Sequence, residues 1–263
     1  MLRILFLGDI VGKPGRKVLK DHLPELKTEF KPDLIIANGE NSAGGLGIDP
    51  STTQEIFSAG AQIITTGNHV WNRRDFLPVL EKEAHRVIRP ANYAPGAPGK
   101  GTCIWESPEG VKVGIVNAMG RIFMGDLLDC PFRLMDKIIH EDFAACDLIF
   151  LDFHAEATSE KVAMSQYLSG RIAVMVGTHT HVQTADERVY ANGLAYISDV
   201  GMCGPRDSVI GMESGAVVER FISGRPAKFE VAGGPPMING VVVDCDPAAK
   251  KAVSIQRINR VYE

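Results

Sequence analysis

Continuous apolar runs alternate with amphipathic stretches along the first two thirds of the chain. The runs are rich in β-branched residues and end at polar or glycine-rich turns, which is typical of buried strands. They cover residues 3–7, 34–37, 62–66, 148–153 and 172–176. Apolar residues at helical spacing predict helices over 16–30, 51–59, 73–83, 133–145 and 159–169. Strands that alternate with helices predict an α/β fold with a mostly parallel sheet.

The pattern changes in two places. Residues 101–118 predict a hairpin around Pro108 and Gly110. The last third of the chain predicts further strands over 194–198, 216–222, 227–232, 238–246 and 252–262, the last two joined by a turn at 247–251. We expect these strands to form a second, more antiparallel sheet that packs on the first. The prediction is a layered α/β/β/α sandwich with two packed mixed sheets, built as a single domain over residues 1–263.

Composition and charge limit the partners and the cellular compartment that we expect for this protein. The chain has 263 residues, 45% of them hydrophobic, and a net charge of −4, so no global charge attracts it to nucleic acid or a membrane. The five cysteines are odd in number and scattered, which favours a reducing cytosol over a disulfide framework. No apolar run reaches the roughly 18 residues of a membrane helix. We expect a cytoplasmic protein with no membrane partner.

Polar side chains follow five successive predicted strands at the point where each strand ends. Because ligands of open α/β sheets bind outside the carboxyl ends of the strands, these side chains are expected at one edge. A single such residue is more often structural, but their coincidence indicates a site. They are Asp9, Glu40 with Asn41, Asn68 with His69, His154, and His179 with His181.

Carboxylate, amide and imidazole groups without cysteine suit hard or borderline metals such as Mn, Fe or Zn. Seven candidate ligands exceed the number that one tetrahedral ion takes, so two ions are expected. Zinc is the weaker candidate, since two amides and a bridging carboxylate suit higher coordination. A P-loop at 8–15 is rejected, because it is one residue short between its glycines and Pro14 stands where Ser or Thr binds magnesium.

The motifs resemble those of the calcineurin-like metallophosphoesterases, and more narrowly the YmdB-like branch. The blocks are GDIVG (8–12), NGEN (38–41), TTGNHVW (65–71), FHAE (153–156) and GTHTHVQTAD (177–186). Two departures from the wider superfamily are shared with this branch. Asp9 is followed by Ile10 and Val11 where Asp-x-His is usual, and Glu40 replaces a bridging aspartate.

The resemblance implies a role for each residue. It assigns one metal to Asp9, Glu40, Asn41 and His181, and the other to Glu40, Asn68, His154 and His179. It implies that His69 is the general acid. Two ions lower the pKa of a water, hydroxide attacks phosphorus in line, and an imidazole protonates the departing oxygen.

The predicted function is therefore a dinuclear phosphodiesterase that hydrolyses cyclic nucleotides, both 2′,3′-cyclic and 3′,5′-cyclic. Two alternatives stay open: a dinuclear hydrolase of a phosphomonoester or amide bond, and a metal-dependent regulatory or sensor module. Arg206, in a loop after a predicted strand, is a weaker candidate for phosphate binding. Trp71 is expected in the core rather than as a platform for a base. RNA as a substrate and a homo-oligomeric assembly are left open.

Overall fold

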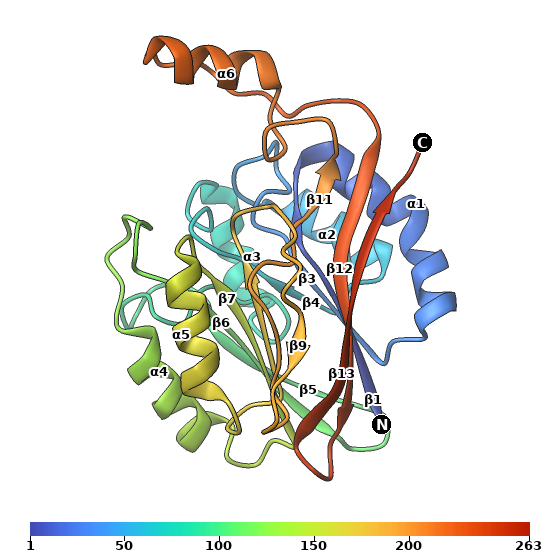
Figure 1. Ribbon diagram of the computed structural model, residues 1–263. Helices are drawn as coiled ribbons and strands as arrows, with labels where there is room; N and C mark the ends of the chain where they lie inside the picture. Colours follow the sequence, from blue (N-terminus) through green and yellow to red (C-terminus); the bar gives the residue numbers. More distant parts are fainter.

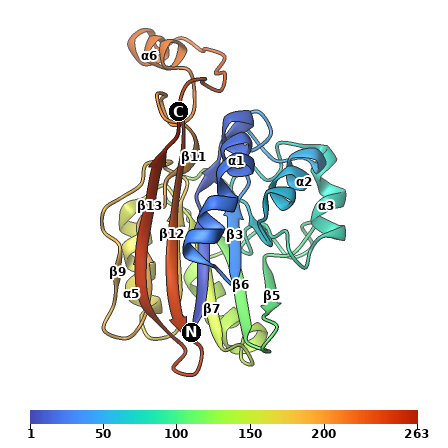
Figure 2. The ribbon, with the colours of Figure 1, turned by 90° about the vertical axis from the view of Figure 1, so that its right-hand side faces the viewer.

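A computed structural model describes the whole chain, residues 1–263. Its strands form two sheets packed face to face, with helices on the outer face of each (Figures 1 and 2). The strands are β1 (Leu2–Leu7), β2 (Asp9–Ile10), β3 (Leu34–Asn38), β4 (Ile63–Thr65), β5 (Thr102–Glu106), β6 (Lys112–Met119), β7 (Leu148–His154), β8 (Val174–Thr178), β9 (Arg188–Val189), β10 (Ala195–Ile197), β11 (Met202–Pro205), β12 (Pro236–Asp246) and β13 (Lys251–Val261). The helices are α1 (Gly12–Phe30), α2 (Pro50–Ala59), α3 (Leu77–Lys82), α4 (Pro131–Lys137), α5 (Thr158–Leu168) and α6 (Ser214–Ser223), with a 3₁₀ turn η1 (Arg74–Phe76) and a π turn η2 (Ile138–Asp142).

Both sheets mix parallel and antiparallel pairs. The first has the order β2-β11-β12-β1-β3-β4, with β13 on β12, and β1, β3 and β4 run parallel. The second has the order β5-β6-β7-β8-β10-β9, with a parallel centre from β6 to β10. Its antiparallel edges are β5, from the predicted hairpin, and β9. The predicted fold class, an α/β fold with two packed mixed sheets, is confirmed.

The core lies in three layers, because successive residues of each strand point to opposite faces. In β1, Ile4 and Phe6 enter the cluster between the sheets, whereas Leu5 and Leu7 pack under α1 and α2. In β7, Phe150 faces the same central cluster and Leu151 faces α5. Strands buried on both faces explain the continuous apolar runs of the sequence.

Helix α2 shows how local sequence sets the ends of an element beside the polar loop at 39–48. Asp49 accepts a hydrogen bond from the Thr52 amide at 2.8 Å, and the Thr52 hydroxyl accepts one from the Asp49 amide at 3.0 Å. This capping box, with Pro50 in the first turn, fixes where the helix begins. It ends at Gly60, whose φ of 123° is costly for other residues.

The prediction for the C-terminal third was partly wrong. Residues 216–222, predicted as a strand, lie in helix α6, and 227–232 contain no strand beyond an isolated bridge at Val231. Helix α6 ends at Gly224, whose φ is 68°, and it projects from the body at the end where β11 lies (Figure 1). The hairpin β12–β13 forms as predicted, but it joins the first sheet beside β1 rather than building a separate one.

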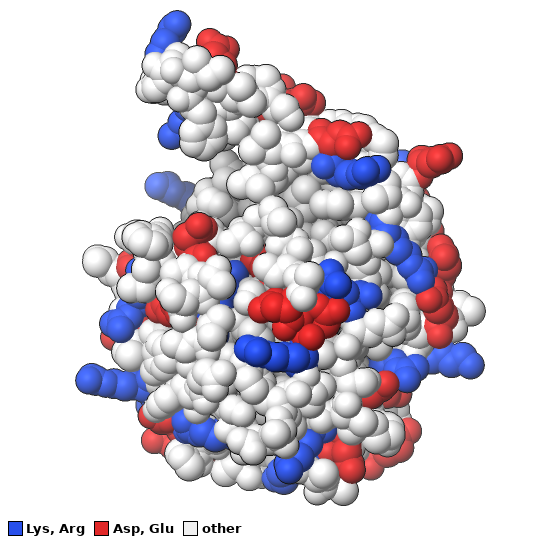
Figure 3. All heavy atoms as spheres, in the orientation of Figure 1, with Lys and Arg blue, Asp and Glu red and all other residues white.

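Two predicted helices are broken. Residues 73–83 split into η1 and α3, and 133–145 split into α4 and η2. No helix of the chain combines the length and apolar character that crossing a membrane requires. On the face drawn in Figure 3, basic and acidic side chains are interspersed without a large patch of one sign, in line with the small net charge.

Candidate metal centre

The structure places the predicted residues at the carboxyl ends of strands from both sheets. Asp9 lies in β2, Glu40 and Asn41 follow β3, and Asn68 and His69 follow β4. From the second sheet, His154 ends β7, and His179 and His181 follow β8. The site is thus shared between the two sheets, and four of these side chains meet closely.

Three of these side chains converge on the Nε2 atom of the fourth, His154. This nitrogen lies 2.9 Å from Asn68 Oδ1, 3.0 Å from Glu40 Oε1 and 3.0 Å from His179 Nδ1. Donor atoms about 2.1 Å from one ion at right angles to each other are separated by about 3 Å. The spacing therefore fits a shared metal ion, and Glu40, His154 and His179 form a group of ligand atoms that all lie within 4.8 Å of one another.

A buried hydrogen-bond chain determines which nitrogen of His154 is free. The hydroxyl of Thr178 donates to Asp152 Oδ1 at 2.7 Å, so it can only accept from His154 Nδ1, 2.9 Å away. With one proton held on Nδ1, His154 directs its Nε2 at the other three side chains, and a metal ion bound there would take the place of the Nε2 proton. Four lone pairs that point at one another need a cation between them. This donor set fits a metal ion.

Three further residues lie beside this group. Asp9 Oδ1 lies 4.0 Å from His181 Nε2, a longer separation than those around His154. Asp9 Oδ1 and Asn41 Oδ1 are both buried and have no hydrogen-bond partner. The amide of Asn41 donates to the Gly45 carbonyl at 3.0 Å, which holds its orientation. Buried oxygens without partners are rare, so these two fit a second ion.

The pKa values of the central groups reflect burial and mutual attraction. Burial raises the pKa of Asp9 to about 6, although His181 and His154 oppose this. Burial alone would lower the pKa of His154, but the nearby Glu40 carboxylate, helped by Asp9, raises it to about 9. Burial and the neighbouring His154 lower the pKa of His179 to about 3. The field of the site therefore favours positive charge at His154 Nε2.

The loop after β8 is held in an uncommon conformation. His179 and His181 have φ values of 101° and 65°, which non-glycine residues rarely adopt. Asp199 accepts from the amide of Thr180 between them at 3.0 Å, and it forms a buried ion pair with Lys161 at 2.8 Å. This pair fixes the backbone that carries both histidines.

Gly67 allows the loop after β4 to approach the site. A Cβ atom at this position would lie 2.3 Å from Glu40 Oε2 and 2.4 Å from His154 Nε2. Such distances are far below van der Waals contact, so no other residue fits without moving these side chains. The close approach places Asn68 and His69 over the ligand group.

His69 lies at the rim of the site. Its backbone amide donates to Glu40 Oε2 at 3.0 Å, and its Nε2 lies 3.4 Å from the amide nitrogen of Asn68. The side chain is partly exposed and does not join the group around His154. This position suits a residue that exchanges protons with a substrate.

Arg206 forms no hydrogen bond or ion pair with the other candidate site residues. Its side chain is exposed, and its ion-pair partner is the adjacent Asp207 at 3.9 Å. The same loop does touch the site, since the Ile210 carbonyl accepts from His181 Nδ1 at 2.8 Å. The role of Arg206 in phosphate binding stays a prediction.

Sequence reasoning missed the buried residues behind the ligands, namely Thr178, Asp152, Asp199 and Lys161. A signal was present for Asp152, because a carboxylate inside the apolar run LIFLDFH must be buried and therefore needs partners. Besides Thr178, two further side chains donate hydrogen bonds to Asp152 Oδ2: the Thr65 hydroxyl at 2.5 Å and the Asn38 amide at 3.1 Å.

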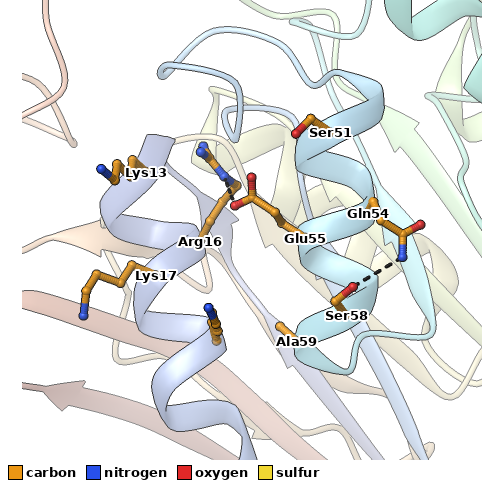
Figure 4. Close-up of a pocket in the computed structure, with 9 residues that line it drawn as sticks. Lys13, Arg16, Lys17, Ser51, Gln54, Glu55, Ser58 and Ala59 are labelled. Atoms are coloured by element: carbon orange, nitrogen blue, oxygen red, sulfur yellow. Dashed lines mark hydrogen bonds and ion pairs between the residues drawn. The ribbon is translucent and has the colours of Figure 1, made fainter.

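A separate cavity lies away from these candidate ligands. It measures about 700 Å³ and lies between α1 and α2, with Lys13, Lys17 and Lys20 on one wall (Figure 4). Arg16 pairs with Glu55 across it at 2.7 Å and also donates to the Ser42 carbonyl. The cavity wall therefore supports the loop that carries Glu40 and Asn41.

Known proteins share this sequence over nearly its whole length. The chain is 45% identical over 257 residues to a 2′,3′-cyclic-nucleotide 2′-phosphodiesterase of Bacillus subtilis (strain 168), a match that covers 98% of this chain and 96% of that protein. The crystal structure of a hypothetical protein from Thermus thermophilus has a TM-score of 0.93 at 38% identity and covers 100% of both chains. That of a novel phosphatase from Mycoplasma pneumoniae has a TM-score of 0.94 at 36% identity, with 100% of this chain and 94% of that chain covered.

The model of the YmdB-like protein family matches residues 5–258. The match includes all five motif blocks on which the resemblance was based, from GDIVG to GTHTHVQTAD. The chain belongs to the YmdB-like family.

Proposed function

We propose that this protein is a metal-dependent phosphodiesterase that hydrolyses nucleoside cyclic phosphates, 2′,3′-cyclic ones first and 3′,5′-cyclic ones as well. The protein is a hydrolase of the phosphoesterase type, as its relatives from Bacillus and Mycoplasma are named. The observation that carries the proposal is the convergence of three potential ligand atoms on His154 Nε2. A phosphodiester is an anionic substrate that two adjacent cations would attract.

Two ions would be held by two overlapping sets of residues. Glu40, Asn68, His154 and His179 would bind one, and Asp9, Asn41 and His181 would bind the other with Glu40 shared. Such ions supply Lewis acidity that activates water and neutralises phosphoryl oxygens. Manganese or iron is proposed over zinc, since amide and carboxylate oxygens suit coordination above four.

His69 would protonate the leaving oxygen. Its ring stands at the rim, held by the turn from Gly67 and by the backbone bond to Glu40 Oε2. Asn68 lies beside it and would keep the ring aimed at the departing ribose oxygen rather than at the ligand group. Separate positions for the ligands and the proton donor are what in-line displacement at phosphorus requires.

The test uses His69→Ala with two substrates. Ribose alkoxide is a poor leaving group and needs a proton, whereas nitrophenolate does not. The variant should lose about 10²–10⁴-fold in kcat on a nucleoside 2′,3′-cyclic phosphate and far less on a nitrophenyl phosphodiester. Its metal content, measured by elemental analysis after reconstitution with Mn²⁺, should match wild type.

Equal losses on both substrates, or a lost ion, would show that His69 is a ligand or a positioning group. The wild-type protein tests the alternative function, hydrolysis of a phosphomonoester. Faster turnover of a nitrophenyl phosphomonoester than of the diester would favour a phosphomonoesterase and contradict the proposal.

A further inference from the structure

A shallow apolar depression of about 400 Å³ lies beside the turn that carries His69. Among the residues that line it are Trp71, Tyr93, Pro98 and Leu127. Six of its seven lining residues are hydrophobic. Trp71, predicted to lie in the core, packs on the core with one side and contributes the other to this surface.

One turn of the chain links the depression to the metal centre. Trp71 follows His69 by two residues in one tight turn, closed by the Val70 amide on the Gly67 carbonyl at 3.3 Å and the Asn72 amide on the His69 carbonyl at 3.1 Å. Tyr93 lies close enough to the metal centre for the charge of Glu40 to act on its hydroxyl. Its pKa is raised by burial, by Asp126 and, to a smaller extent, by Glu40.

Its walls suit a flat aromatic ring. Trp71 and Tyr93 meet edge to face, with ring centroids 5.2 Å apart and an interplanar angle of 71°, so each ring stabilises the position of the other. The Tyr93 hydroxyl donates to Asp126 Oδ1 at 3.1 Å, which ties the loop at 121–129 to this wall. On that loop Leu127, which also lines the depression, is 96% exposed, an unusual state for a large apolar side chain.

We propose that this depression binds the nucleobase of the substrate whose phosphate lies at the metal centre. The inference rests on the proposed function and extends it to substrate recognition. A phosphate at His69 would place the base of the same nucleotide a few ångströms along the turn, at Trp71. Of the two polar groups in the lining, the Tyr93 hydroxyl donates to Asp126 and the Trp71 indole N–H donates to Tyr93. Recognition is therefore by stacking, which tolerates all four bases.

The first experiment reads binding without catalysis. The chain has two tryptophans, so Trp105→Phe leaves Trp71 as its sole indole fluorophore. Titration with AMP should quench this fluorescence to saturation, while ribose 5-phosphate, which lacks the base, should leave it unchanged. Quenching should weaken when Leu127→Ser is added, a change at an exposed position that leaves the core intact. No quenching by AMP, or equal quenching by both compounds, would overturn the inference.

The second experiment measures kcat/KM on a nucleoside 2′,3′-cyclic phosphate and on 1-O-methylribose 2′,3′-cyclic phosphate, which has no base. The ratio of the two values should fall about 5- to 150-fold in Trp71→Leu, through KM, and recover in Trp71→Phe. An unchanged ratio would contradict the base subsite and would mean that Trp71 only supports the fold or His69. Wild type that hydrolyses neither ester would refute the proposed function, and the AMP titration would still decide the subsite.

Discussion

Thr178→Val removes one hydroxyl and keeps the shape of the side chain, so it tests the chain that orients His154. The Thr178 hydroxyl accepts from His154 Nδ1 at 2.9 Å and donates to Asp152 Oδ1 at 2.7 Å, and all three residues are completely buried. In the valine variant the imidazole N–H has no acceptor. The ring can then turn or move its proton to Nε2, the atom on which Asn68, Glu40 and His179 converge.

The magnitudes follow from these two bonds. A hydrogen bond to a charged group contributes about 1.5–3 kcal/mol, and a buried donor without a partner costs about 1–3 kcal/mol. The free energy of unfolding should therefore fall by roughly 3–5 kcal/mol. The fold should survive, because Asp152 keeps its bonds to Thr65 and Asn38. The affinity for Mn²⁺ should fall about 10–100-fold, as is usual when a partner behind a ligating histidine is lost.

The assay is competition for Mn²⁺ against a chromophoric chelator, with urea unfolding of the same samples. Thr178→Ser is the matched control, since it restores the hydroxyl and removes only a methyl group. It should bind Mn²⁺ within a fewfold of wild type. Wild-type affinity in the valine variant, or equal loss in the serine variant, would refute the role of the hydroxyl.

Two further predictions concern the same centre. Gly67→Ala should abolish metal binding and activity while leaving the far-UV spectrum unchanged, because its Cβ would collide with Glu40 and His154; an active variant with full metal content would contradict the geometry. Metal affinity should rise about tenfold per pH unit between pH 6 and 9, because an ion must displace the proton from His154, whose pKa is about 9. Below pH 6 the rise should be about a hundredfold per unit, since Asp9, whose pKa is about 6, must also lose a proton. Chelator competition from pH 5 to 9, corrected for the protonation of the chelator, measures both slopes, and a flat profile between pH 6 and 9 would exclude this linkage.

Strand ends were the part of the site that sequence could locate. A buried strand has a strong signature, and the residue after it lies at the sheet edge whatever the neighbouring strands are. Glu40, Asn68 and His154 could therefore be placed at this edge without knowledge of the strand order, and their role as ligands stays a prediction. The order of the strands could not be predicted from the sequence, because the placement of β12 beside β1 depends on tertiary packing. The same holds for Thr178, which sequence shows only as one more β-branched residue at the end of a strand.

Helix α6 shows where local composition misleads. The segment AVVERFI is rich in β-branched and aromatic residues, which favour strands. The segment pairs with no strand of either sheet, and its apolar residues Val217 and Phe221 are four apart, on one face of a helix. Phe221 and Ile222 remain more than 80% exposed, so burial did not decide between the two conformations.

The candidate ligands are divided between the two sheets, and this has a consequence for how the protein folds. The carboxylates and amides come from β2 and from the loops after β3 and β4 of the first sheet, while His154 ends β7 and His179 follows β8 of the second. An ion can therefore bind tightly only after the sheets have docked, which is late in folding. An interaction absent from the folding transition state slows unfolding and leaves the refolding rate unchanged. Stopped-flow refolding should give the same rate with Mn²⁺ as with chelator, whereas unfolding should be slower with Mn²⁺; faster refolding with Mn²⁺ would mean that the two sheets meet at this edge first.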